Sequence, residues 1–126
     1  MTRKAIIVES LGTAGPYAHA VDAGGLIFLS GQTPKDPATG KMVGGGIEAQ
    51  TRQSFANLFA VLAKAGLGSG DVQKVNVYLT DMEDFAAMNA VYKQQFTAPY
   101  PARTTIGVAS LPEGAKIEIE MIVRGK

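Results

Sequence analysis

The sequence predicts a single α+β domain in which two helices pack on one face of a mixed β-sheet. Residues 47–65 and 81–96 carry apolar side chains at helical spacing, whereas residues 26–29, 75–80 and 116–124 show the short apolar runs or strict alternation typical of strands. Strands therefore lie before, between and after the two helices, as α+β folds require. The chain has 126 residues and no break in composition, so we expect one domain over residues 1–126.

The first third of the chain predicts a three-stranded meander followed by a loop. Residues 5–8, 17–21 and 26–29 are short apolar segments, and turn-forming residues border the last of them. The run Leu-Ile-Phe-Leu at 26–29 is apolar at every position, so we expect both faces of this strand to be covered. Residues 33–46 are rich in proline and glycine and predict a loop that contributes nothing to the core.

Both helices show end signals as well as periodicity. The first, over residues 47–65, should be roughly 28 Å long and end at Gly66. Its apolar face consists of Ile47, Phe55, Leu58, Phe59 and Leu62. The second has Asp81 as its expected N-cap and Asp84 near the positive end of the helix dipole. Its apolar stripe consists of Phe85, Met88, Tyr92 and Phe96.

The last part of the chain predicts an antiparallel hairpin. Residues 103–110 and 116–124 alternate as strands, and Leu-Pro-Glu-Gly at 111–114 predicts the turn between them. In the last strand Ile117, Ile119, Met121 and Val123 share one face. Two helices can cover only one face of the sheet, so we expect another copy of the chain to cover the other.

Charged residues of the predicted hairpin suggest a site. With a four-residue turn, one sheet face would carry Arg103, Thr105, Gly107, Glu118 and Glu120. One interpretation is an inter-strand salt bridge at an oligomer interface. The other is a binding site in which a guanidinium binds a substrate carboxylate through bidentate hydrogen bonds, while a nearby glutamate holds water or transfers a proton.

Composition and motifs exclude several classes of protein. A net charge of +1 with scattered basic residues disfavours a nucleic-acid binder, and the absence of cysteine excludes disulfides, thiolate nucleophiles and the usual structural zinc sites. No apolar run approaches the roughly 20 residues of a membrane span, so we expect a soluble cytoplasmic protein without a membrane partner. His19, the only histidine, is expected to be a partly exposed strand residue without a catalytic role.

Several motifs resemble the RidA (YjgF-like) family of reactive imine and enamine deaminases. They are G-P-Y-A-H-A-V at 15–21, F-L-S-G-Q-T-P at 28–34, V-Y-L-T-D-M-E-D-F-A-A-M-N-A-V-Y at 77–92, Y-P-A-R-T-T at 100–105 and A-K-I-E-I-E at 115–120. The resemblance runs in order and with matching spacing from about Gly15 to Glu120. Agreement of several separate motifs is far more specific than any one of them.

The resemblance implies a fold like the bacillus-type chorismate mutase, assembled as a homotrimer with three clefts between subunits. It implies hydrolysis of 2-imino or enamino acids, such as 2-iminobutyrate or 2-iminopropionate, to 2-oxo acids and ammonia, without a metal or organic cofactor. By the same resemblance, Arg103 binds the substrate carboxylate and Glu118 positions the attacking water. The expected lining of the cleft is Tyr17, Ser30, Gly31 and Asn89, completed by main-chain groups near Gly31 and Thr105.

Two departures from the family pattern concern the pocket. Thr105 stands where many relatives have cysteine, and Ala18-His19 replaces a Ser-Gln pair, so we expect altered pocket size and an altered rim. Two other functions stay open: a trimeric binding module for 2-oxo acids, or a chaperone-like holdase. A ribonuclease has no supporting constellation, because the chain has one histidine and no basic groove is predicted.

Overall fold

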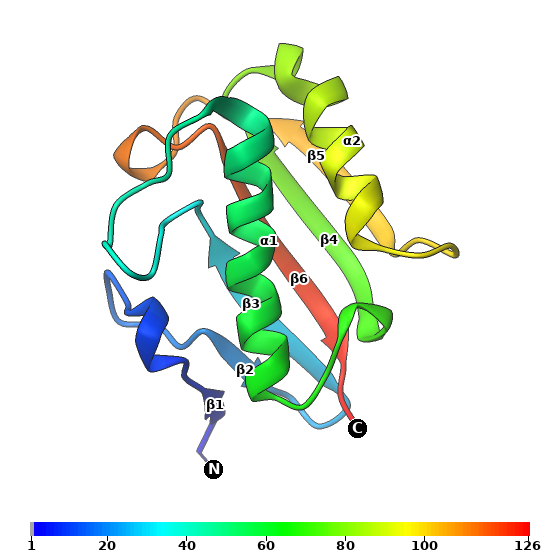
Figure 1. Ribbon diagram of the computed structural model, residues 1–126. Coiled ribbons are helices and arrows are strands. Elements are labelled where there is room, and N and C mark those ends of the chain that lie inside the picture. Colours follow the sequence, from blue (N-terminus) through cyan, green and yellow to red (C-terminus); the bar gives the residue numbers. More distant parts are fainter. Residues whose placement is uncertain (1) are drawn as a thin grey trace.

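The protein is described by a computed structural model that covers residues 2–126 and contains two α-helices and six strands (Figure 1). Short 3-10 turns lie at Glu9–Leu11, Ser69–Asp71, Met82–Asp84 and Pro112–Gly114. The main elements, in chain order, are β1 (Lys4–Ile6), β2 (Ala20–Asp22), β3 (Leu26–Gln32), α1 (Gly46–Lys64), β4 (Val72–Leu79), α2 (Phe85–Gln95), β5 (Ala102–Gly107) and β6 (Ile117–Arg124).

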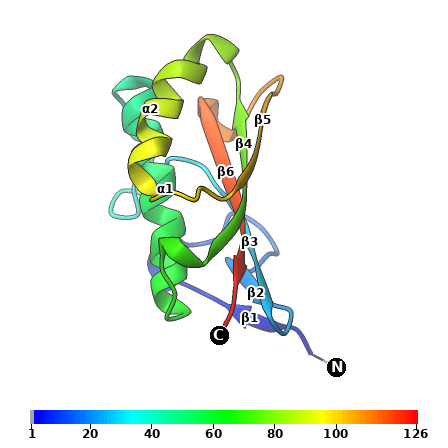
Figure 2. The same cartoon turned by 90° about the vertical axis from the view of Figure 1, so that its right-hand side faces the viewer.

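The six strands form one mixed sheet in the order β1-β2-β3-β6-β4-β5. The pair β4–β5 is parallel and all other pairs are antiparallel. Figure 2 shows both helices on the same side of the sheet, and no helix of residues 2–126 covers the other side. The predicted α+β class, with two helices on one face of a mixed sheet, is therefore confirmed. We call the two sides the helix side and the open side.

The predicted final hairpin is wrong. Strand β6 lies between β3 and β4, whereas β5 pairs only with β4, in parallel, at the edge of the sheet. The reason is the connection through α2: a helical crossover returns the chain to the same end of the sheet, so the strand after it runs parallel to the strand before it. The segment after β5 then passes over the end of β4, where the Val108 amide donates to the Leu79 carbonyl at 2.8 Å.

The core lies between the helices and the inner face of the sheet. Alternate residues of the two central strands are buried: Val75, Val77, Leu79, Ile117, Ile119, Met121 and Val123. The Phe55 ring of α1 packs edge-on against Tyr92 and Phe96, with ring centroids 5.7 and 5.8 Å apart. The predicted apolar faces of both helices are confirmed, apart from Phe85, which is 36% exposed.

The helix ends follow the predicted signals with one shift. Gly66 follows α1 with φ of +75°, which favours glycine and ends the helix. The Asp81 carboxylate accepts a hydrogen bond from the Glu83 amide at 2.9 Å. It therefore caps the 3-10 turn Met82–Asp84, and α2 itself begins at Phe85.

The open side is apolar in places and uncovered in the single chain. In β3, Ile27 and Leu29 are buried by the helices, whereas Leu26 and Phe28 are 44% and 46% exposed on the other side. Ile106 of β5 is also 46% exposed. Cover of both faces of β3 by a second copy stays a prediction. No helix within residues 2–126 has the length and apolar character of a membrane span.

Candidate functional site

Arg103 and Glu118 lie on opposite sides of the sheet, contrary to the predicted shared face. Arg103 pairs with Val75 in the parallel β4–β5 ladder, and Val75 is fully buried beneath the helices. Glu118 pairs with Tyr78, which alternates with the buried residues of β4 and so faces the open side. The predicted shared face requires that a four-residue turn join two adjacent strands. Because β5 and β6 are not neighbours, the number of residues between them does not determine which face each side chain occupies.

Arg103 is held against α2 by stacking and by one hydrogen bond. Its guanidinium carbon lies 4.5 Å from the Tyr92 ring centroid and 5.5 Å from that of Phe85, within the range of cation–π attraction. Its Nη1 donates to Asn89 Oδ1 at 2.7 Å. These contacts fix the plane of the guanidinium and leave its other N–H donors without an acceptor among residues 2–126.

No carboxylate of the described chain neutralises Arg103. The side-chain ion pairs within residues 2–126 join Lys4 to Asp22 and Lys35 to Glu113. A hollow of about 410 Å³ opens beside the guanidinium, and we call it the Arg103 hollow. It is lined by Asn89, Tyr92, Lys93, Tyr100, Pro101 and Arg103. An oriented cation beside an open hollow is suited to binding an anion.

Thr105 shares the helix side with Arg103, two residues further along β5. It pairs with the buried Val77, and its own Oγ1 is buried. That hydroxyl has no hydrogen-bond partner within residues 2–126. A buried polar atom without a partner normally costs free energy, so Thr105 is a polar group free to receive one.

The open side carries a second hollow of about 520 Å³ around Glu118, which we call the Glu118 hollow. Its lining includes four residues from the predicted site, Tyr17, Ser30, Gly31 and Glu118, together with Glu120. Burial raises the pKa of the Glu118 carboxyl, and the neighbouring Glu120 charge raises it further. Glu118 therefore holds a proton more readily than an ordinary glutamate.

Gly31 allows Glu118 to approach the main chain of β3. A Cβ added at Gly31 would overlap Glu118 Oε2 and lie 3.0 Å from its Cδ. Gly31 does not need a left-handed backbone, because no positive φ is found there. The glycine is therefore required for space.

Glu120 is held differently from Glu118. It accepts hydrogen bonds from the Tyr78 hydroxyl and from Asn76 Nδ2, the latter at 3.3 Å. The hydrogen bond to Glu120 is the main reason that the pKa of Tyr78 is raised to about 12. The Glu118 carboxylate accepts no hydrogen bond from residues 2–126, so it is the glutamate free to orient a water.

Tyr17 and Ser30 form the rim of the Glu118 hollow. Tyr17 is 47% exposed, and its hydroxyl accepts a 3.4 Å hydrogen bond from the Ala14 amide. The Ser30 hydroxyl donates to the Ala18 carbonyl at 2.7 Å, which ties the main chain beside Tyr17 to β3. Ser30 can therefore offer a ligand only its acceptor lone pairs while this bond lasts.

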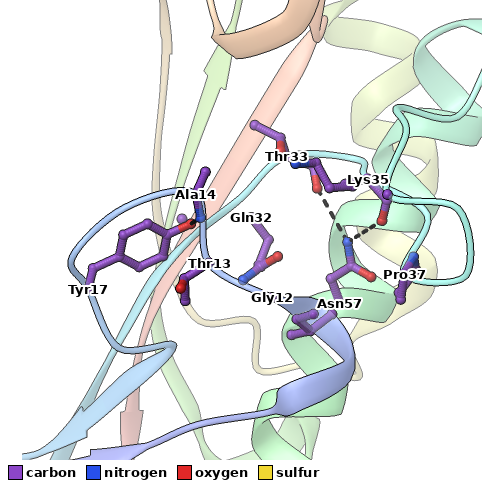
Figure 3. A pocket seen from close by; sticks show the side chains of 12 residues that line it. Gly12, Thr13, Ala14, Tyr17, Gln32, Thr33, Lys35, Pro37 and Asn57 are labelled. Carbon is purple, nitrogen blue, oxygen red and sulfur yellow. Dashed lines mark hydrogen bonds between the residues drawn. The ribbon is translucent and has the colours of Figure 1, made fainter.

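A smaller hollow of about 270 Å³ lies behind the rim (Figure 3). Figure 3 shows Tyr17 and Thr13 on one side of it and Asn57 of α1 on the other. Asn57 Nδ2 donates to the carbonyl oxygens of Thr33 and Lys35 at 3.3 and 2.8 Å, so it fixes the loop after β3. The walls of this hollow thus belong to the same loops that shape the rim.

The predicted site residues fall into two groups within one chain. Tyr17, Ser30, Gly31 and Glu118 meet in the Glu118 hollow, while Asn89, Thr105 and Arg103 share the helix side near α2. Sequence reasoning missed Tyr92, which stacks on Arg103, and Asn76 and Tyr78, which hold Glu120. Alternation in β4 places Asn76 and Tyr78 opposite its buried face, but only the β4–β6 register brings them to Glu120.

Known proteins resemble this chain over almost its whole length. A family model described as "Endoribonuclease L-PSP" matches residues 7–124. Protein DfrA of Myxococcus xanthus is 49% identical over 125 residues, covering 97% of this chain and 95% of that protein. The 2-iminobutanoate/2-iminopropanoate deaminase of Salmonella typhimurium is 46% identical over 123 residues, covering 94% and 95%. The crystal structure of E. coli TdcF with bound serine superposes with a TM-score of 0.91 at 42% identity, covering 98% of this chain and all of that one.

Proposed function

Because the chain belongs to the family described as Endoribonuclease L-PSP, which is the family of the RidA deaminases, we propose that it hydrolyses reactive 2-imino or enamino acids. Two relatives named 2-iminobutanoate/2-iminopropanoate deaminase, and one named as a reactive intermediate deaminase, support a general imine deaminase role. The products are 2-oxo acids and ammonia, and the proposed substrates include 2-iminobutyrate and 2-iminopropionate. The reaction takes place in the cytoplasm without a metal or an organic cofactor.

The environment of Arg103 is the observation that carries the proposal. Its guanidinium is oriented by Asn89 and Tyr92, lacks a carboxylate partner within residues 2–126, and borders an open hollow. A small 2-imino acid carries a carboxylate that matches the remaining N–H donors. The imine carbon, one bond away from that carboxylate, is then held at a fixed distance from Arg103.

Completion of the site requires more than one protomer. Arg103 and Glu118 face opposite sides of the sheet in one chain, so they serve one substrate only if a second protomer brings its Glu118 hollow to the Arg103 hollow of the first. The exposed Leu26, Phe28 and Ile106 supply apolar surface for such contact. We propose a homotrimer of the chorismate-mutase-like type, with its catalytic clefts between subunits.

In the proposed mechanism, position and proton transfer provide the acceleration. Arg103 anchors the carboxylate, and Glu118 orients a water toward the imine carbon. The water oxygen bonds to that carbon while one of its protons passes through Glu118 to the imine nitrogen. The resulting carbinolamine gives its hydroxyl proton to nitrogen and expels ammonia, which leaves the 2-oxo acid. The raised pKa of Glu118 suits this role, because it makes the carboxylate a better proton acceptor.

An imine-trapping assay tests the proposal. An amino-acid oxidase generates 2-iminobutyrate, semicarbazide traps it, and catalytic amounts of the protein should lower the trapped product. Arg103→Ala should abolish most of this effect, and Arg103→Lys should restore it only weakly because lysine lacks the planar fork. An Arg103→Ala protein that clears the imine at the parental rate would contradict the assignment. Suppression only at stoichiometric protein would favour a binding module for 2-oxo acids.

A further inference from the structure

His19 is fully buried, contrary to the partly exposed position expected from its sequence. It is 1% exposed, and both ring nitrogens contact the main chain of the preceding loop. The Val8 amide lies 2.9 Å from Nδ1, and the Gly12 carbonyl oxygen lies 2.7 Å from Nε2. An amide N–H can only donate and a carbonyl oxygen can only accept, so Nδ1 carries no proton and Nε2 carries one.

These two hydrogen bonds close the loop that carries Tyr17. Val8 and Gly12 lie 11 and 7 residues before His19, so the ring holds the start and the middle of residues 8–19. The other end is tied to β3, where the Ser30 amide donates to the His19 carbonyl at 2.9 Å. Residues of this loop line both the Glu118 hollow and the smaller hollow behind it (Figure 3).

We propose that neutral His19, in its Nε2–H form, is the positioning residue that holds the Tyr17 rim of the Glu118 hollow. Loss of the Nδ1 acceptor would leave the Val8 amide without its partner and so release this end of the loop. The catalytic consequence of this release rests on the proposed function, whereas the effect on the loop does not. His19 itself touches no substrate in this proposal.

The surroundings of His19 offer no counter-charge for a protonated ring. Glu9, in the 3-10 turn between its two partners, is exposed, and β3 has no charged residue. Asp22 of β2 pairs with Lys4 at 3.9 Å. The charged residues of α1 are exposed: Glu48, Arg52 and Lys64. No aspartate or glutamate within residues 2–126 is fully buried, so protonation of His19 would leave a buried charge without a partner.

Two substitutions test the hydrogen bonds of the His19 ring. His19→Gln keeps an acceptor and a donor of similar reach but cannot be protonated, and His19→Leu removes both. Glu9→Gln is the matched control, because it removes the nearest exposed charge of the same segment and leaves His19 intact. All proteins are used as full chains without a histidine tag, so that His19 is the only imidazole in the NMR spectrum.

The first measurement is independent of catalysis. Long-range proton–nitrogen spectra of the parent at neutral pH should show the Nε2–H form, and the Val8 amide should exchange slowly with solvent. In His19→Leu the protection factor of the Val8 amide, which compares its exchange rate with the unfolded-chain rate at the same pH, should fall by about two- to tenfold for the loss of one hydrogen bond. His19→Gln should keep the protection factor of the parent, because its side chain can still accept from the Val8 amide.

The second measurement is the KM for 2-iminobutyrate at neutral pH. His19→Leu should raise this KM, and Glu9→Gln should leave it at the parental value. His19→Gln should also keep the KM of the parent. A ring protonated on Nδ1 at neutral pH, or a Val8 protection factor that is unchanged in His19→Leu, would overturn the proposal. If the parent hydrolyses no imine, only the proposed function is contradicted, since the exchange measurement still decides the role of His19. If His19→Leu does not fold, the comparison of the parent with His19→Gln decides the role of His19.

Discussion

Gly31→Ala should damage the Glu118 hollow far more than it damages the fold. The new Cβ would overlap Glu118 Oε2 and lie 3.0 and 3.2 Å from its Cδ and Cγ. Carbon atoms normally pack at about 3.5–4.0 Å, so the Glu118 side chain must move by about 0.5–1 Å. A displacement of about 1 Å from the reactive geometry costs roughly a hundredfold in rate. We therefore expect the imine-clearing rate to fall about a hundredfold.

The effect on the free energy of unfolding should be smaller. Overpacking of a core typically costs about 1–3 kcal/mol, and here the clashing group is a side chain that can turn toward the hollow, so we expect about 1 kcal/mol. Denaturant unfolding measures this value, and the trapping assay with semicarbazide measures the rate. Gly44→Ala is the matched control, because nothing lies within 4 Å of a Cβ there and the residue has no positive φ.

A double substitution tests whether the clash with Glu118 causes the stability loss in Gly31→Ala. In a Glu118→Ala background the clash is absent, so adding Gly31→Ala should cost no further stability. Such a double-mutant cycle isolates the coupling between the two positions. Two results would refute the reasoning: parental activity in Gly31→Ala, or a stability loss that persists in the Glu118→Ala background.

Three other predictions follow from the open side of the sheet. The pKa of Glu118 is raised in the folded protein, so the native state retains this proton more strongly than the unfolded chain does. The free energy of unfolding should therefore fall as pH rises from the ordinary glutamate pKa of 4.5 through the raised pKa of the folded state. Denaturation of Glu118→Gln at a series of pH values should lack this fall. Tyr78→Phe should lower stability by about 1 kcal/mol through the lost bond to Glu120. It should also remove the ionisation near pH 12 from an ultraviolet titration of the tyrosines, and an unchanged titration would contradict the contact. Phe28→Glu should convert the proposed trimer, three times the chain mass of 13.2 kDa, to monomer in analytical ultracentrifugation, whereas an unchanged mass would exclude β3 from the interface.

The helices and the buried faces could be predicted from the sequence because their signals are local. Spacing alone identifies the buried stripe of α1, and alternation alone identifies Val75 and Val77 as core residues. Strand order is different, since it depends on pairing between distant segments. Insertion of β6 between β3 and β4 produces no local pattern in the sequence, so the sequence of the last two strands resembles that of a hairpin.

The same distinction applies to the candidate site. Arg103 and Glu118 stand out by residue type and motif, but the side of the sheet that each faces depends on strand order. Burial of His19 could not be predicted either, because its two partners are main-chain atoms, which carry no residue-specific signal. Stacking of Tyr92 on Arg103 requires the packing of α2 over β5, whereas the helical stripe indicated only a core residue.

Because of Tyr92, the Arg103 hollow should tolerate fewer substitutions than the Glu118 hollow. Its ring contacts the Arg103 guanidinium on one side and the Phe55 ring of α1 on the other. Substitutions that retune the anion-binding end therefore disturb the packing between the helices as well, and laboratory evolution should find few tolerated changes there. The rim that faces Glu118 is built mainly from loops, so new side-chain preferences should arise at that end first.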